Sequence, residues 1–126
     1  MRQNFSGGSP YEPVAGYCRA VRVGNVVHVA GTTAMVDGQP AHVRDFAAQT
    51  RTILEIIKGA LEEAGASLED VVRTRIYVTD ISRWEEVARA HGEVFGRIRP
   101  VTTLVEVSAL IAPEYGVEIE AEAVLA

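Results

Sequence analysis

The segment from Val117 to Leu125, VEIEAEAVL, alternates apolar and acidic residues over most of its length. Successive side chains of a β-strand point to opposite faces of a sheet, so this segment must bury one face and leave the other open. The buried face carries Val117, Ile119, Ala121, Ala123 and Leu125, and the open face carries Glu118, Glu120 and Glu122. The chain must therefore contain a sheet that is covered on one side and acidic on the other.

The other elements follow from hydrophobic spacing. Apolar residues three or four apart predict a helix over residues 46–64, which Gly65 ends, and a second helix that starts at the capping-box sequence Ser82–Glu85 and stops before Pro100. Alternating patterns predict four more strands, at residues 19–23, 26–30, 72–78 and 101–107. Residues 1–16 and 31–41 are rich in turn-forming residues and are expected to be irregular.

The resulting order, ββαβαββ, predicts one α+β domain over residues 1–126, with a mainly antiparallel sheet and two helices on one face. The open face carries the three glutamates on one strand and Arg73, Arg75 and Tyr77 on another. Arginines on a neighbouring strand would relieve the repulsion among the carboxylates. A face of this kind is a candidate subunit interface in a closed symmetric oligomer.

Composition excludes several classes of protein. The 126 residues hold 12 Lys and Arg against 17 Asp and Glu, a net charge of −5, which argues against a nucleic-acid or membrane-surface binder. One cysteine, Cys18, rules out an intrachain disulfide, and three histidines without ligand spacing make a metal site improbable. No apolar run reaches the roughly 20 residues of a membrane span, and no signal-like segment is visible, so we expect a cytoplasmic protein.

Few residues suggest chemistry by themselves. One of the three glutamates could act as a general base on water, or all three could form a strand face that is solvated or paired with arginines. Tyr17 could donate a hydrogen bond to a ligand or keep its hydroxyl in water, and His91 fits a hydrogen-bonded core histidine better than a ligand-binding one. From these residues alone the type of reaction stays open.

Four stretches nevertheless resemble one family, the RidA family (also called YjgF or L-PSP endoribonuclease). They are GYCRAVRVGNVVHVAG (16–31), AAQTRTILEIIKGALEEAGASLEDVVRTRIYVTD (47–80), RPVTTLVEV (99–107) and VEIEAEAV (117–124). The resemblance implies a homotrimer of chorismate-mutase-like α+β subunits with clefts between neighbouring subunits. It also implies hydrolysis of reactive imines and enamines to a carbonyl compound and ammonia, without a metal or organic cofactor.

The resemblance assigns roles residue by residue. The cleft tyrosine of the family matches Tyr17, the glutamate that positions the attacking water matches Glu118, and the glycine facing the cleft matches Gly31. Thr102 stands where active deaminases have the arginine that binds the substrate carboxylate. Leu104, Ala30 and Ala88 replace a cysteine, a hydroxyl residue and an asparagine of the family.

The missing arginine leaves three possibilities: another cation (Arg19, Arg75 or Arg99) reaches the cleft, the substrate lacks a carboxylate, or the deaminase chemistry is lost. A charge-assisted fork to a carboxylate is worth about 1.5–3 kcal/mol, and Thr102 can offer one neutral hydrogen bond. We therefore expect a trimeric imine or enamine deaminase, or else a non-catalytic trimer that binds a small metabolite. Glu118 and Tyr17 would be catalytic, and substrate contacts would come from Gly31, Thr32, Thr102, Leu104 and His91.

Overall fold

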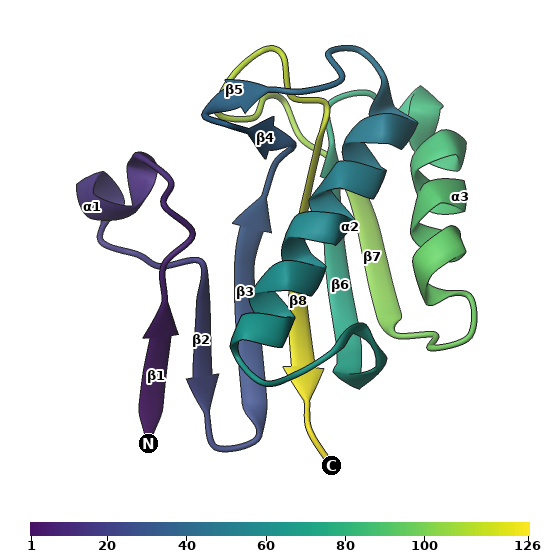
Figure 1. Cartoon of the computed structure of the whole chain (residues 1–126). Coiled ribbons are helices and arrows are strands. Elements are labelled where there is room, and N and C mark those ends of the chain that lie inside the picture. The colour runs from purple at the N-terminus through teal and green to yellow at the C-terminus, as the bar shows by residue number, and fades with distance from the viewer.

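A six-stranded mixed sheet dominates the structure. The computed structural model describes residues 1–126, and Figure 1 shows the arrangement of the elements. In chain order these are β1 (Arg2–Phe5), α1 (Tyr11–Ala15), β2 (Ala20–Val23), β3 (Val26–Thr32), β4 (Met35–Val36), β5 (Gln39–Pro40), α2 (Phe46–Glu63), η1 (Leu68–Asp70), β6 (Val71–Val78), η2 (Ile81–Arg83), α3 (Trp84–Phe95), β7 (Val101–Glu106) and β8 (Val117–Val124).

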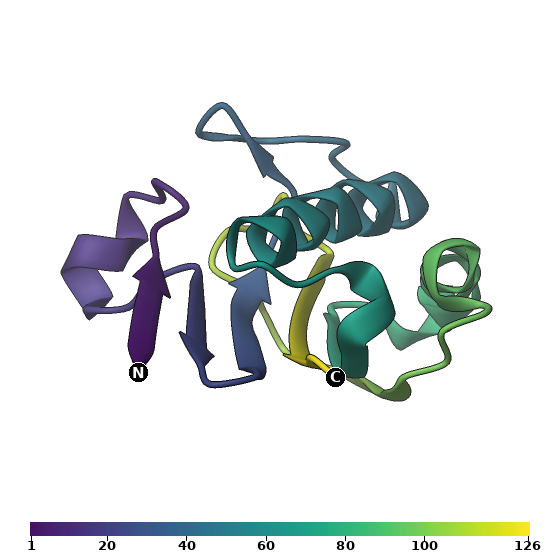
Figure 2. The same ribbon diagram turned by 60° about the horizontal axis from the view of Figure 1, so that its bottom comes forward.

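The strands follow the order β1-β2-β3-β8-β6-β7, and β4 pairs with β5 in a separate two-stranded ribbon. All neighbours in the large sheet are antiparallel except β6 and β7, which are parallel. Both long helices cover the same face of this sheet, as Figure 2 shows, and the opposite face is open. The predicted α+β class is therefore confirmed. None of the helices is both long enough and apolar enough to cross a membrane.

Helix α2 forms where the periodicity predicts it, and both of its ends are capped. Asp45 accepts a hydrogen bond from the backbone N–H of Ala48 at 2.9 Å, which satisfies a free donor of the first turn. At the other end Gly65 has a φ of 84°, and the N–H groups of Gly65 and Ala66 donate to the carbonyls of Glu62 and Leu61. This is a Schellman motif, which a glycine accommodates without strain. The helix buries Ile53, Leu54, Ile57 and Leu61 in the core.

Three local predictions are wrong. Residues 1–16 are not irregular throughout, because they contain the edge strand β1 and the short helix α1. Residues 31–41 hold the end of β3 and the β4–β5 ribbon. The second long helix does not begin at a Ser82 capping box, because Asp80 accepts hydrogen bonds from both the N–H and the hydroxyl of Ser82 and starts the 3₁₀ turn η2 instead. Helix α3 then ends at Phe95, before Pro100.

A fully buried glutamine, Gln49 on α2, holds together the loops at one end of the sheet. Its amide nitrogen donates to the carbonyls of Ala41, His42 and Glu114 at 3.3, 3.2 and 2.9 Å. Its amide oxygen accepts the N–H of Gly116 at 2.9 Å. Gln49 therefore fixes the loop before α2 and the loop that leads into β8, and both lie at the end of the sheet where β8 begins.

Replacing Gln49 with methionine would leave the Gly116 N–H and the Glu114 carbonyl without these partners. We expect Gln49→Met to lower the free energy of unfolding by about 2–4 kcal/mol, because each buried unsatisfied group costs about 1–3 kcal/mol. Urea denaturation at fixed protein concentration measures this. Glu55→Gln, an exposed change on the same helix, is the control and should stay within about 0.5 kcal/mol of the wild type. An equal effect in both variants would contradict the role of Gln49.

Candidate functional site

The open face of β8 carries the three glutamates, and two of them are paired. Glu122 lies 3.3 Å from His28 Nδ1 and 3.3 Å from Arg73 Nε. Glu120 lies 3.6 Å from Arg75 Nη1 and accepts a hydrogen bond from the hydroxyl of Tyr77. Glu120 and Glu122 therefore form the arginine-paired strand face that was one of the expectations from the sequence.

Glu118 differs from the other two. It makes no hydrogen bond and no ion pair, although it lies opposite Tyr77 in the register, because the Tyr77 hydroxyl is directed to Glu120 instead. Burial raises the pKa of the Glu118 carboxyl, the charge of Glu120 raises it further, and the charge of Arg19 lowers it only in part. An acid with a raised pKa and no structural partner is a candidate for proton transfer.

A β-bulge on β3 makes room for the Glu118 side chain. Val29 pairs with Ala121 and Thr32 pairs with Ile119, so Ala30 and Gly31 together face the single residue Glu120. A Cβ atom on Gly31 would lie 2.2 Å from Glu118 Oε2, so the carboxylate packs directly on the glycine backbone. Bulges are frequent next to active sites because they redirect side chains locally.

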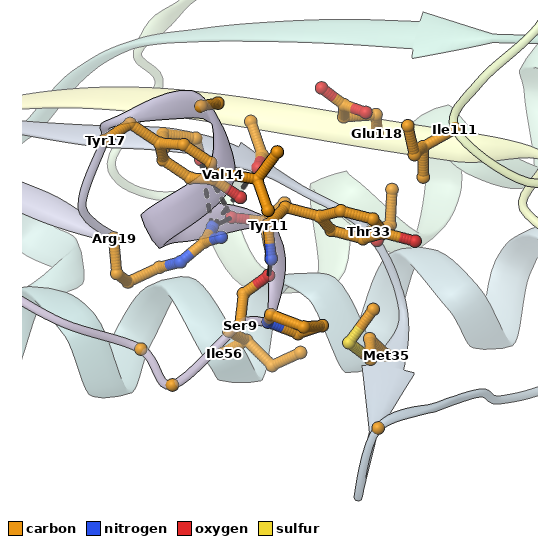
Figure 3. A pocket seen from close by; sticks show the side chains of 18 of the residues that line it. Ser9, Tyr11, Val14, Tyr17, Arg19, Thr33, Met35, Ile56, Ile111 and Glu118 are labelled. Atoms are coloured by element: carbon orange, nitrogen blue, oxygen red, sulfur yellow. Dashed lines mark hydrogen bonds between the residues drawn. The ribbon is translucent and has the colours of Figure 1, made fainter.

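Glu118 faces a pocket of about 940 Å³ at the end of the sheet. Tyr17, Arg19, Gly31 and Thr32 line the same pocket, and Figure 3 shows Tyr17, Arg19 and Glu118 among its side chains. The structure thus brings together four residues predicted for the site, namely Glu118, Tyr17, Gly31 and Thr32, together with one of the three candidate cations. The pocket therefore combines an unpaired acid, a phenol and a guanidinium.

The loop before α1 supports this pocket through a second acid, Glu12, which is buried. Its carboxylate accepts from Ser6 Oγ at 2.9 Å and from the N–H groups of Gly7 and Ser9 at 2.9 and 3.2 Å. Burial alone would raise the pKa of Glu12, but these hydrogen bonds and the charge of Arg19 outweigh it and lower the pKa. Glu12 is thus an anion that holds the loop, and its oxygens are already engaged.

Three predicted site residues lie outside this pocket within one chain. Thr102 and Leu104 belong to β7, which is separated from β3 by β8 and β6. His91 Nε2 lies 2.9 Å from Thr74 Oγ1, which in turn lies 2.8 Å from Thr102 Oγ1. Burial lowers the pKa of His91 and favours its neutral form. This is the hydrogen-bonded core histidine of the sequence analysis, and a site role for these three residues stays a prediction about neighbouring subunits.

The contribution of α1 to the pocket was not predicted from the sequence. Tyr11 and Val14 line it, and both side chains are well exposed, at 39% and 86%. The available signal was Pro10 and Pro13, because proline is favoured in the first turn of a helix. No three His, Cys, Asp or Glu side chains are grouped in a way that could hold a metal ion.

Comparison with known proteins identifies the family of the chain. The Endoribonuclease L-PSP family pattern matches residues 8–125. A RutC family protein of Pyrococcus abyssi is 38% identical over 101 residues, 79% of each chain. The 3-aminoacrylate deaminase RutC of Acinetobacter baylyi is 36% identical over 113 residues, 89% of this chain and 88% of that one.

Solved structures agree with the sequence relatives. Rv2704 of Mycobacterium tuberculosis, a member of the YjgF/YER057c/UK114 family, is 58% identical with a TM-score of 0.90 and covers 99% of this chain and 100% of its own. The YjgF gene product of E. coli is 27% identical with a TM-score of 0.84 and covers 97% of this chain and 98% of its own. The chain belongs to the Endoribonuclease L-PSP family, also called the RidA or YjgF family, as the sequence resemblance implied.

Adding a methyl group at Gly31 tests the packing of the bulge on Glu118. Gly31→Ala should lower the free energy of unfolding by about 1–2 kcal/mol, because the methyl group would displace the carboxylate. Gly59→Ala is the matched control, since a Cβ there meets nothing within 4 Å and lies on an exposed helix face. It should raise stability by about 0.5–1 kcal/mol. Urea denaturation would contradict the packing argument if both variants gained stability.

The raised pKa of Glu118 has a consequence for stability. A carboxyl group whose pKa is higher in the folded than in the unfolded state favours folding below its unfolded pKa, and this contribution is lost as the pH rises through its folded pKa. Glu118→Gln should therefore melt at a higher temperature than the wild type at neutral pH, and the difference should shrink toward about pH 4. Glu122→Gln, which loses ion pairs with His28 and Arg73, should show no such gain. A lower melting temperature for Glu118→Gln at neutral pH would contradict the assignment.

Proposed function

We propose that this protein is a RidA-like hydrolytic deaminase that converts a reactive imine or enamine to a carbonyl compound and ammonia in the Glu118 pocket. The observation that carries the proposal is the unpaired Glu118 carboxylate, whose pKa is raised and which shares a pocket with the Tyr17 hydroxyl. The relationship to a 3-aminoacrylate deaminase supports the same class of reaction.

The chemistry needs one group that can both accept and donate a proton. The imine reacts in its protonated form: Glu118 takes a proton from water as the water oxygen bonds to the C=N carbon, and the C=N electron pair moves to nitrogen, which becomes a neutral amino group. Glu118 then returns its proton to the nitrogen of this adduct. The C–N bond breaks, ammonia leaves, and the remaining hydroxyl loses its proton to form the carbonyl. An enamine enters the same sequence after protonation at carbon, which gives the protonated imine directly.

The other pocket residues have supporting roles in this proposal. The Tyr17 hydroxyl has no protein partner and is free to hydrogen-bond the substrate or the water. Gly31 leaves space beside the carboxylate, where a larger side chain would displace it. Thr32 is almost fully buried, and its hydroxyl donates to the Ala30 carbonyl at 2.8 Å, so it stabilises the bulge at the pocket wall.

The proposal includes a homotrimer with its sites between subunits. Edge strand β7 is largely exposed in the single chain, and the charged face of the sheet has no cover. A neighbouring subunit packed there would bring Thr102, Leu104 and His91 toward a pocket that one chain leaves open. Light scattering tests this, and a monomer at micromolar concentration would remove the shared site.

The second candidate function is binding without catalysis, in which a trimer binds a small metabolite and does not hydrolyse it. Thr102 favours this second candidate, because active deaminases of the family have an arginine at that position. The two functions differ in one measurement. A binding protein would take up a small 2-oxoacid in the pocket and yet leave the decay of every imine unchanged.

Imines generated in the assay by an amino-acid oxidase provide the test, with the remaining imine trapped by semicarbazide. The wild type should speed the loss of at least one imine, and Glu118→Gln should reduce that rate by about 100-fold or more, as expected for a lost general base. Glu122→Gln makes the same change on the same strand outside the pocket, and should stay within about twofold of the wild type.

The pH profile gives an independent check. Activity should fall as the pH drops through a pKa above the ordinary range of a glutamate, because the base must be ionised. Wild-type protein that clears no imine, or a Glu118→Gln variant that is fully active, would overturn the deaminase proposal.

A further inference from the structure

Arg19 is the one cationic side chain that lines the Glu118 pocket. The other two candidate cations are occupied elsewhere. Arg75 lies 3.6 Å from both Glu120 and Glu122, and Arg99 donates its Nε to the Gly96 carbonyl at 3.0 Å, just after α3. Strand β7, which begins just after Arg99, starts at the end of the sheet opposite to the end where β8 begins (Figure 1).

The guanidinium of Arg19 is held by one of its three nitrogens. Nη1 donates to the carbonyls of Ala30 and Gly31 at 3.3 and 3.2 Å, and it also contacts the Thr32 hydroxyl. Nε and Nη2 have no partner in the protein. An arginine presents five N–H donors in a planar fork, so the edge formed by Nε and Nη2 is free. Two parallel donors on one edge match the two oxygens of a carboxylate.

The acids near Arg19 leave its Nε–Nη2 edge without an ion pair. Gly7 packs close to the Arg19 side chain, since a Cβ atom there would lie 3.0 Å from Arg19 Cβ and 3.2 Å from Arg19 Nε. Glu12 is the nearby acid whose charge is coupled to Arg19, but its oxygens accept from Ser6, Gly7 and Ser9 and it forms no ion pair with Arg19. Arg19 forms no ion pair with any other acid either, whereas Arg73 and Arg75 on the open sheet face do.

We propose that Arg19 binds the carboxylate of the substrate, so that the pocket takes an imine or enamine acid rather than a neutral imine. This inference rests on the proposed deaminase function and names its substrate class. The carboxylate would lie on the free Nε–Nη2 edge, and the C=N carbon would lie between that edge and Glu118. Thr102 on β7 carries no positive charge. The positive charge would come instead from Arg19, which precedes β2 and contacts the bulge on β3.

Binding of a matched pair of probes tests the inference without using catalysis. The probes are 2-oxobutanoate and its methyl ester, which differ in the anionic carboxylate, and calorimetry or NMR titration measures their dissociation constants. The wild type should prefer the acid by about 10–100-fold. Arg19→Gln should abolish that preference by weakening the acid alone. Arg19→Lys, which keeps the charge but loses the planar fork, should restore part of it.

The control is Arg89→Gln, which removes an exposed cation that pairs with Glu85 on α3 and should keep the wild-type preference for the acid. The inference is overturned if the wild type binds the acid no better than the ester, or if Arg19→Gln keeps the preference. It is also overturned if Arg19→Gln weakens both probes equally, because the arginine would then only hold the bulge. Failure of the deaminase proposal would give a different result. The wild type would then clear no imine, although it would still bind the acid more tightly than the ester.

Discussion

The register of β8 between its two neighbours determines what each acid on the open face becomes. Glu122 lies between His28 and Arg73, and Glu120 lies opposite Arg75, so both carboxylates meet cations directly. Glu118 lies opposite Tyr77 on one side and next to the bulge on the other, where no cation is within ion-pair distance. Three identical side chains thus have different surroundings. A shift of one residue would exchange the charged and the buried faces of the strand.

The bulge on β3 and the pocket depend on each other. An extra residue in one strand leaves carbonyl groups out of the regular ladder, and here Arg19 takes up those of Ala30 and Gly31. The same arginine is thereby placed in the wall that Glu118 faces. Arg19 therefore has two effects: it donates hydrogen bonds to the carbonyl groups of the bulge, and it places a positive charge in the pocket. This explains why the bulge and Glu118 lie together.

The sequence predicted the parts of this structure that have long periodic patterns. The alternation of residues 117–125 and the apolar stripe of residues 46–64 each involve many positions, so single exceptions do not hide them. Strand β1 has four residues with no alternation, helix α1 has five, and Asp80 competes with Ser82 for the same helix start. The expectation that Tyr17 and Glu118 share a site, which the pocket bears on by containing both, came from the family resemblance and not from periodicity. A β-bulge leaves no periodic pattern in the sequence. The hydrogen bonds of Arg19 to the bulge, and the two nitrogens that they leave free, could therefore be found only in the structure.

An unpaired carboxylate in this position is difficult to explain by folding alone. Burial disfavours its ionised form, and a Glu118→Gln exchange would keep the shape of the side chain without that cost, so a purely structural strand would gain by it. Arg73 and Arg75 on the open sheet face are already paired with Glu120 and Glu122, and Arg19, the one cation that lines the pocket, forms no ion pair with Glu118. A carboxylate and a guanidinium that line one cavity without pairing are both available to an anionic substrate, as the proposal for Arg19 requires. Pairing Arg19 with Glu118 would stabilise the chain and remove both groups from chemistry.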